Sequence, residues 1–193
     1  MADTVKQYTE REEIKQRTAM PLLWISMVGM GMAFAGLSSA YIIRQADTDW
    51  LTFDMPQPFY ISALIIIASH GTMITAQKAV KKNQLITVKN MVAASLVLGL
   101  LFVGSQFYAY SYMVEHGLHL VGTSISSSFM YVLTGFHLVH LFAGLIVLSV
   151  TLFQTSRNKY NAENHLGLSL AATFWHFLGV LWIYLVLFLA FIR

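Results

Sequence analysis

Two histidines lie three residues apart in the otherwise apolar segment TGFHLVHLFAG. On a helix, His137 and His140 would be about 60° apart, so both can face the same neighbouring helix. Imidazoles in such surroundings need a hydrogen-bond partner or a metal. Three kinds of chemistry are therefore open: binding of a cofactor, transfer of protons, and hydrogen bonding between helices.

A haem needs axial ligands from facing helices, and two histidines on one helix cannot bind opposite faces of one haem. His70 and His176 also lie in apolar runs, but only His176 is a plausible third metal ligand, and the chain has no cysteine. Hydroxyl and amide side chains, in contrast, are plentiful as partners. We therefore expect no catalytic, cofactor-binding or metal-binding residue here. The histidines instead belong to a polar helix-packing network formed by Gln106, Thr134, His137, His140 and His176.

Proton and ion pathways through membranes usually rely on buried carboxylates or charge pairs. The nine acidic residues all lie in the N-terminal tail or between the apolar runs: Asp3, Glu10, Glu12, Glu13, Asp47, Asp49, Asp54, Glu115 and Glu163. This distribution argues against a stand-alone pump, a proton-coupled transporter or a voltage sensor.

The elements that position these residues are membrane spans. The chain has 193 residues, of which 56% are hydrophobic and 11% charged. About 20 apolar residues cross the roughly 30 Å of hydrocarbon. The sequence predicts an all-α polytopic membrane protein with a charged tail over residues 1–20 and a five-helix domain over 21–193. The predicted spans are 21–43, 59–77, 90–112, 124–154 and 168–192.

Basic residues set the expected orientation. Ten of the twelve Lys and Arg fall in the tail, the second-to-third connection and the fourth-to-fifth connection. The positive-inside rule places these segments in the cytoplasm. We therefore predict a multi-pass protein of the bacterial inner membrane with a cytoplasmic N-terminus and a periplasmic C-terminus.

Small residues recur on the predicted spans at spacings that allow helices to approach closely. The candidates for helix packing are Gly29, Gly31, Ala33, Gly36, Gly135 and Gly144. They can serve the chain's own bundle or contact another membrane subunit, and the spacing leaves both open. Aromatic residues, Trp175 and Trp182 among them, are expected at the headgroups as interfacial anchors.

Two ordered motifs support a family resemblance: TGFHLVHLFAG (134–144) and NHLGLSLAATFWHFLGVLWIYL (164–185). With weaker matches in GLLFVGSQFYAY (99–110) and ISALIIIASHGT (61–72), the chain resembles subunit III of the haem–copper terminal oxidases, in the short five-helix bacterial form. The resemblance implies a subunit without haem or copper, which partner subunits hold. It would pack against catalytic subunit I of a proton-pumping oxidase that reduces O2, stabilise it and bind phospholipid in a cleft.

Membrane lipids and other oxidase subunits are thus the implied partners, with a respiratory supercomplex as a further option and no nucleic acid. The chain departs from the family at four positions where acidic residues are common: Met30, Ala109, Ser169 and Gly179. The resemblance therefore does not carry the role of those carboxylates over to this chain. The electron donor, cytochrome c or quinol, stays open, as does the enzyme class of the complex.

Two other functions remain as alternatives. An accessory protein of a nitric-oxide reductase would resemble the same family and have a similar length. A small secondary transporter is suggested by the span count alone, and the carboxylate-free interior argues against it.

Overall fold

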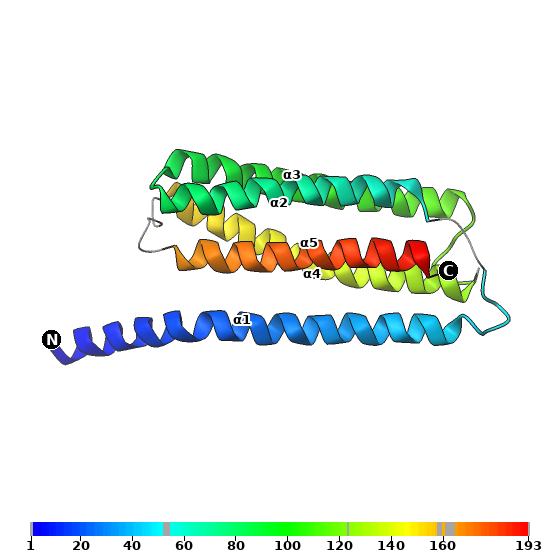
Figure 1. The fold of residues 1–193 in the computed structure, drawn as a ribbon, viewed down its shortest axis with the longest axis horizontal. Coiled ribbons are helices and arrows are strands. Elements are labelled where there is room, and N and C mark those ends of the chain that lie inside the picture. Colours follow the sequence, from blue (N-terminus) through cyan, green and yellow to red (C-terminus); the bar gives the residue numbers. More distant parts are fainter. Residues whose placement is uncertain (1, 52–54, 123, 158–159, 161–164, 193) are drawn as a thin grey trace.

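The computed structural model describes residues 2–51, 55–122, 124–157, 160 and 165–192. These residues form five α-helices and no strand: α1 (Ala2–Arg44), α2 (Gln57–Lys81), α3 (Leu85–Glu115), α4 (Ile125–Ser156) and α5 (Leu166–Phe191) (Figure 1). Each helix is long and apolar enough to cross a membrane, and in α1 the membrane-spanning part is Arg17–Arg44. The prediction of an all-helical fold with five spans is confirmed.

Helices α2 to α5 form a four-helix bundle in which each helix packs against two others. The contacting pairs are α2 with α3, α3 with α4, α4 with α5, and α5 with α2. Within the described part of the chain, α1 contacts only α4 and α5. Figure 1 shows α1 along one side of the bundle, with α5 between it and α2 and with its N-terminal end projecting beyond the other helices.

Helix α1 is longer than the predicted first span, because it begins at Ala2 and continues through most of the charged tail. Pro21, expected in the first turn of that span, therefore lies inside the helix. Proline has no N–H to donate to the carbonyl four residues earlier. That carbonyl belongs to Arg17, an exposed residue at the end of the spanning part, where water or headgroups can satisfy it.

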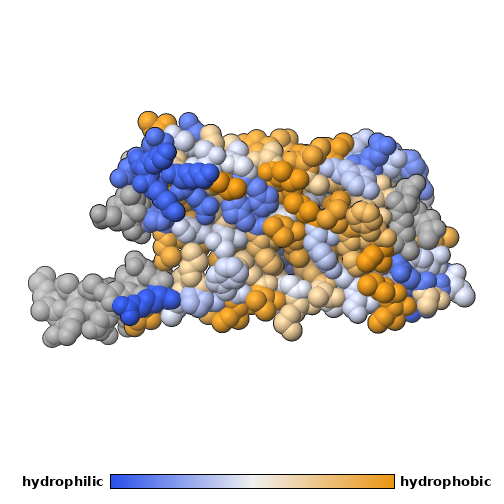
Figure 2. All heavy atoms as spheres, viewed as in Figure 1, coloured by the Kyte–Doolittle hydropathy of each residue, from blue (hydrophilic) through white to orange (hydrophobic). Residues whose placement is uncertain are grey.

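The outside of the molecule has the polarity of a membrane protein. Figure 2 shows hydrophobic residues over the middle of the visible face and hydrophilic residues gathered at its two ends. Many large apolar side chains are exposed, among them Ile67, Val139 and Val180. In hydrocarbon this exposure costs nothing, because lipid tails are as apolar as these side chains.

Trp175 and Trp182 are fully buried inside the bundle, so the prediction that they anchor the chain at the headgroups is wrong. Each indole N–H donates a hydrogen bond to a serine hydroxyl on α2, which gives the polar edge of the ring a partner away from water. A glycine on α3 and one on α4, Gly99 and Gly144, leave room for the ring of Trp175.

Candidate functional site

His137 lies at the centre of the bundle with no exposed surface. Its ring is surrounded by aromatic side chains, with centroids 5.1 Å from Trp182, 6.2 Å from Phe102 and 6.3 Å from Phe34. Neither ring nitrogen has a hydrogen-bond partner among the described residues, and the same holds for both amide atoms of the buried Gln106. These two side chains are therefore held by packing and not by a hydrogen bond to a described residue.

Thr134, one turn before His137, connects two helices. Its hydroxyl donates to the carbonyl of Met130 at 2.6 Å and accepts a hydrogen bond from the hydroxyl of Tyr110 on α3 at 3.1 Å. A threonine hydroxyl can donate once and accept as well, so both bonds can exist together. Thr134 therefore joins α4 to α3 through Tyr110, which lies one turn after Gln106 on α3.

His140 is half-buried and faces the helix outside the bundle. Its Nδ1 is 2.8 Å from the carbonyl oxygen of Phe136, one turn earlier in the same helix. The ring centroid lies 5.9 Å from that of Phe34 on α1. His140 thus belongs to the contact between α1 and α4.

His176 is paired with a histidine that the predicted network did not include. Its Nδ1 lies 2.5 Å from Nδ1 of His70 on α2, and the two rings stack with centroids 4.7 Å apart and planes 11° apart. Neutral imidazole carries one N–H, so one ring donates and the other accepts. A Cβ at Gly179 would overlap Nε2 of His70, so this glycine provides the space in which the His70 ring lies.

Two further polar connections between helices involve serines of α2 that sequence reasoning passed over. Trp175 Nε1 donates to Ser69 Oγ at 2.9 Å, and Trp182 Nε1 donates to Ser62 Oγ at 3.1 Å. The two serines, Ser62 and Ser69, are seven residues apart on α2, and the two tryptophans, Trp175 and Trp182, are seven residues apart on α5. This matched spacing is a signal in the sequence that could have predicted the antiparallel register.

The five predicted residues therefore do not form one hydrogen-bonded network in the part of the chain that the structure describes. Thr134 joins α3 and α4, His140 packs on α1, and His176 joins α5 to α2. Within the same described residues, no group of three or more His, Asp or Glu side chains lies close enough to hold a metal ion. The arrangement is suited to holding helices together.

The predicted small residues fall into two groups. A Cβ at Gly144 would lie 2.7 Å from Leu178 and 3.3 Å from Trp175, so this glycine is needed for packing inside the bundle. Gly135 has one neighbour at the limit of contact, the hydroxyl of Tyr110 at 4.0 Å. On α1, a Cβ at Gly29, Gly31 or Gly36 would meet nothing within 4 Å, and Ala33 is exposed.

A mainly apolar cleft of about 580 Å³ separates α1 from α4 and α5. Its walls include Leu22, Val150 and Phe174, and polar groups occur at the end of the cleft where Gln154 and Tyr160 lie. There the hydroxyl of Tyr160 donates to Oε1 of Gln154 at 2.5 Å. Burial raises the pKa of the Tyr160 hydroxyl, so it stays neutral. The cleft thus has an apolar interior and a neutral, hydrogen-bonding rim.

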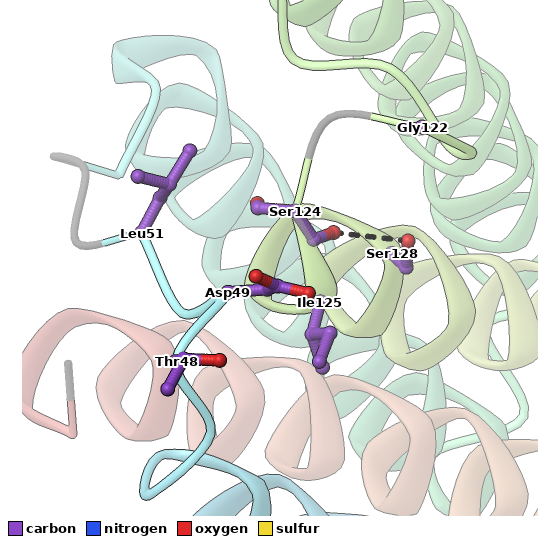
Figure 3. Close-up of a pocket in the computed structure, with 7 residues that line it drawn as sticks. All are labelled: Thr48, Asp49, Leu51, Gly122, Ser124, Ile125 and Ser128. Atoms are coloured by element: carbon purple, nitrogen blue, oxygen red, sulfur yellow. Dashed lines mark hydrogen bonds between the residues drawn. The ribbon is translucent and has the colours of Figure 1, made fainter.

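A second hollow, of about 590 Å³, lies at the other end of the molecule (Figure 3). The connection after α1 contributes Thr48, Asp49 and Leu51, and the start of α4 contributes Ser124 and Ser128. Ser128 donates to the backbone carbonyl of Ser124 at 3.1 Å. The described lining thus contributes one exposed carboxylate, that of Asp49, and the Ser128 hydroxyl is already bonded to backbone.

Comparison with known proteins gives the same family as the two motifs. The family model described as cytochrome c oxidase subunit III matches residues 51–192. The cytochrome c oxidase subunit 3 of Thermostichus vulcanus is 29% identical over 168 residues, which cover 84% of this chain and 82% of the relative. The corresponding protein of a Synechocystis species is 30% identical over 165 residues, covering 82% and 69%.

That of Corynebacterium diphtheriae is 29% identical over 170 residues, with 84% and 82% covered. The family match includes α2 to α5 and therefore the whole four-helix bundle, with the Trp–Ser bonds, the histidine pair and His137. The chain therefore belongs to the cytochrome c oxidase subunit III family.

Proposed function

We propose that the chain is a non-catalytic structural subunit of a proton-pumping haem–copper oxidase. It packs against catalytic subunit I, which holds the haem and copper and reduces O2, and it stabilises that subunit in the membrane. Family membership supports an oxidase subunit III. One observation carries the structural role: α1 presents a face of small residues that no described part of the chain covers.

That face lies opposite the side of α1 that packs on the bundle. Met27, Phe34 and Tyr41 repeat every seven residues and are buried against the bundle. Gly29 and Gly36 are also seven apart, but exposed. Ala33 and the half-exposed Ala40 extend them into a line along the helix. We call Gly29, Ala33, Gly36 and Ala40 the outer stripe of α1.

Lipid-facing helices have no need of small residues, whereas contacts between membrane helices are rich in them. In the most apolar window of α1 only 11% of residues are buried, against 33–56% in the other four helices. The outer stripe is therefore suited to close approach by a helix of the catalytic subunit. Of the predicted polar residues, Thr134 and His176 connect helices of the bundle that supports α1, and His140 packs against α1 itself.

The cleft between α1, α4 and α5 gives the subunit a second role, the binding of phospholipid. Its apolar walls suit an acyl chain, and the rim formed by Gln154 and Tyr160 suits the polar part of a lipid. A lipid in this position would fill the space that separates α1 from the bundle, and so fix the angle at which the outer stripe meets its partner.

The protein lies in the bacterial inner membrane with its N-terminus in the cytoplasm and its C-terminus in the periplasm. Basic residues in the last turn of α2 and in the connections on that side support this orientation. Alkaline phosphatase fused to the C-terminus should be active, because it folds only in the periplasm. An inactive phosphatase fusion, together with fluorescence from a green fluorescent protein fused to the same C-terminus, would contradict this orientation.

Co-purification tests the structural role. Gly36→Leu places a large side chain on the outer stripe and should release the catalytic subunit during purification in mild detergent. Gly104→Leu on α3 is the matched control, because a Cβ there also meets nothing within 4 Å and the change in helix propensity is the same. Equal retention of the catalytic subunit by both variants would contradict the proposal.

A further inference from the structure

A third hollow, of about 320 Å³, lies between the C-terminal end of α2 and the N-terminal end of α5. It is separate from the cleft beside α1, because the two share no residue. Its lining mixes basic, neutral polar and apolar groups: Ile74, Gln77, Lys78, Val80, Lys81, His165, Leu168 and Ser169.

The hollow has a positive character. Lys78 and Lys81 lie one turn apart on the same face of α2, and both are exposed. Neither has an ion-pair or hydrogen-bond partner among the described residues, and no described residue that lines the hollow is acidic. Two lysine residues thus line a space whose described lining contributes no compensating negative charge.

Two polar side chains and the end of a helix also line the hollow. Nδ1 of His165 is buried without a hydrogen-bond partner among the described residues, and Ser169 contributes a hydroxyl. His165 is also the N-cap of α5, and its side chain makes no capping hydrogen bond. The N-terminal end of a helix carries a partial positive charge and attracts anions. Ammonium, imidazole, hydroxyl and helix end together match the oxygens of a phosphate group.

The surface next to the hollow indicates what the phosphate is attached to. Ile67 and Ile74 continue the face of α2 on which Lys78 and Lys81 lie, and their exposed fractions are 50% and 42%. This line leads from the basic end of the span towards the middle of the membrane. A lipid whose phosphate lies at the lysines could extend an acyl chain along these isoleucines.

We infer that this hollow binds the headgroup phosphate of an anionic phospholipid. Basic pockets between membrane helices at the cytoplasmic surface are suited to such headgroups. The site needs only the membrane location of the chain and does not depend on its assembly with an oxidase. Each lysine contributes to the affinity through its charge, and the α2 isoleucines distinguish a lipid from a free phosphate ion.

Titration of the purified full-length chain with phosphatidylglycerol, followed by native mass spectrometry, tests the site. Lys78→Gln/Lys81→Gln should weaken phosphatidylglycerol binding about 30-fold, or about fivefold for each lysine. Lys82→Gln/Lys89→Gln is the matched control, because it removes two exposed lysines near the same end that do not line the hollow. The control should change binding less than twofold.

Phosphatidylcholine should bind much more weakly than phosphatidylglycerol, and inorganic phosphate at millimolar concentration should not displace the lipid. Equal weakening by the two double variants would show diffuse surface charge and overturn the site. Equal binding of phosphatidylcholine, or displacement by phosphate alone, would overturn the lipid assignment. If Lys78→Gln/Lys81→Gln fails to fold, Lys81→Gln alone must weaken binding about fivefold; an unchanged affinity would reject the site.

Discussion

Gly99 inside the four-helix bundle and the glycines Gly29 and Gly36 on α1 have opposite surroundings. In the bundle, a Cβ at Gly99 would lie 2.7 Å from both Leu145 and Trp175, so the space that glycine leaves is already filled. On α1, the space beside Gly29 and Gly36 is open. Small residues with close neighbours are explained by packing within the chain. Small residues without neighbours, in a helix that otherwise faces lipid, point to packing against another chain.

Polar contacts differ between the two regions in the same way. Tryptophan and serine side chains connect α5 to α2 by hydrogen bonds within the bundle. Helix α1 instead meets the bundle through ring contacts, such as Tyr41 with Phe188 at 5.4 Å between centroids. Helices α2 and α5 are therefore joined by side-chain hydrogen bonds, while α1 packs on the bundle through apolar and ring contacts.

The largest expected effect is that of filling a glycine inside the bundle. Gly99→Val should destabilise the protein by about 3 kcal/mol, because Trp175 is fixed by its bond to Ser69 and cannot yield. In detergent this lowers Tm by roughly 10 °C. Gly29→Val on α1 is the control and should leave the Tm of the isolated chain nearly unchanged. Equal losses would remove the contrast between bundle and α1.

Breaking one tryptophan–serine bond should have a smaller effect. Trp175→Phe should cost about 2 kcal/mol, since it removes the hydrogen bond and part of the ring volume. With Ser69→Ala it completes a double-mutant cycle, and we expect a coupling energy of about 1 kcal/mol between the two side chains. Additive effects of the two substitutions on thermal unfolding would show that the hydrogen bond between Trp175 and Ser69 does not stabilise the bundle.

The smallest effect is expected at the histidine pair. His176→Phe keeps an aromatic ring but removes the hydrogen bond to His70, and should cost about 1 kcal/mol. His140→Phe is the matched control, because among the described residues its ring nitrogen bonds only to a carbonyl of its own helix. Thermal unfolding should therefore separate the two variants. A larger loss for the control would mean that the contact with α1 is the stronger one.

The fold could be predicted from the sequence because spans depend on local composition. The five apolar runs correspond to the five helices. The largest difference between a predicted span and the observed helix is at α1, which continues through Pro21 into the charged tail. Burial is not local. Trp175 and Trp182 were placed at the headgroups by residue type, although each lies well inside α5, where a serine on α2 provides a partner.

The candidate site was only partly predictable for the same reason. Residue types and helix spacing identify which histidines lie in the membrane, but not the rotation and register of the helices that decide which of them meet. His176 therefore pairs with His70 on α2 and not with His137, while Gly179 makes that approach possible. The matched seven-residue spacings of two serines and two tryptophans were the signal that could have fixed the register.

The central claim is that the outer stripe of α1 contacts the catalytic subunit, and photo-crosslinking in native membranes tests it most directly. A photoreactive amino acid at Ile25, which is 69% exposed beside Gly29, should crosslink to the haem–copper subunit. The same probe at Val139 on α4, which is 65% exposed, should crosslink to lipid. A crosslink to the catalytic subunit from Val139 and not from Ile25 would contradict the claim.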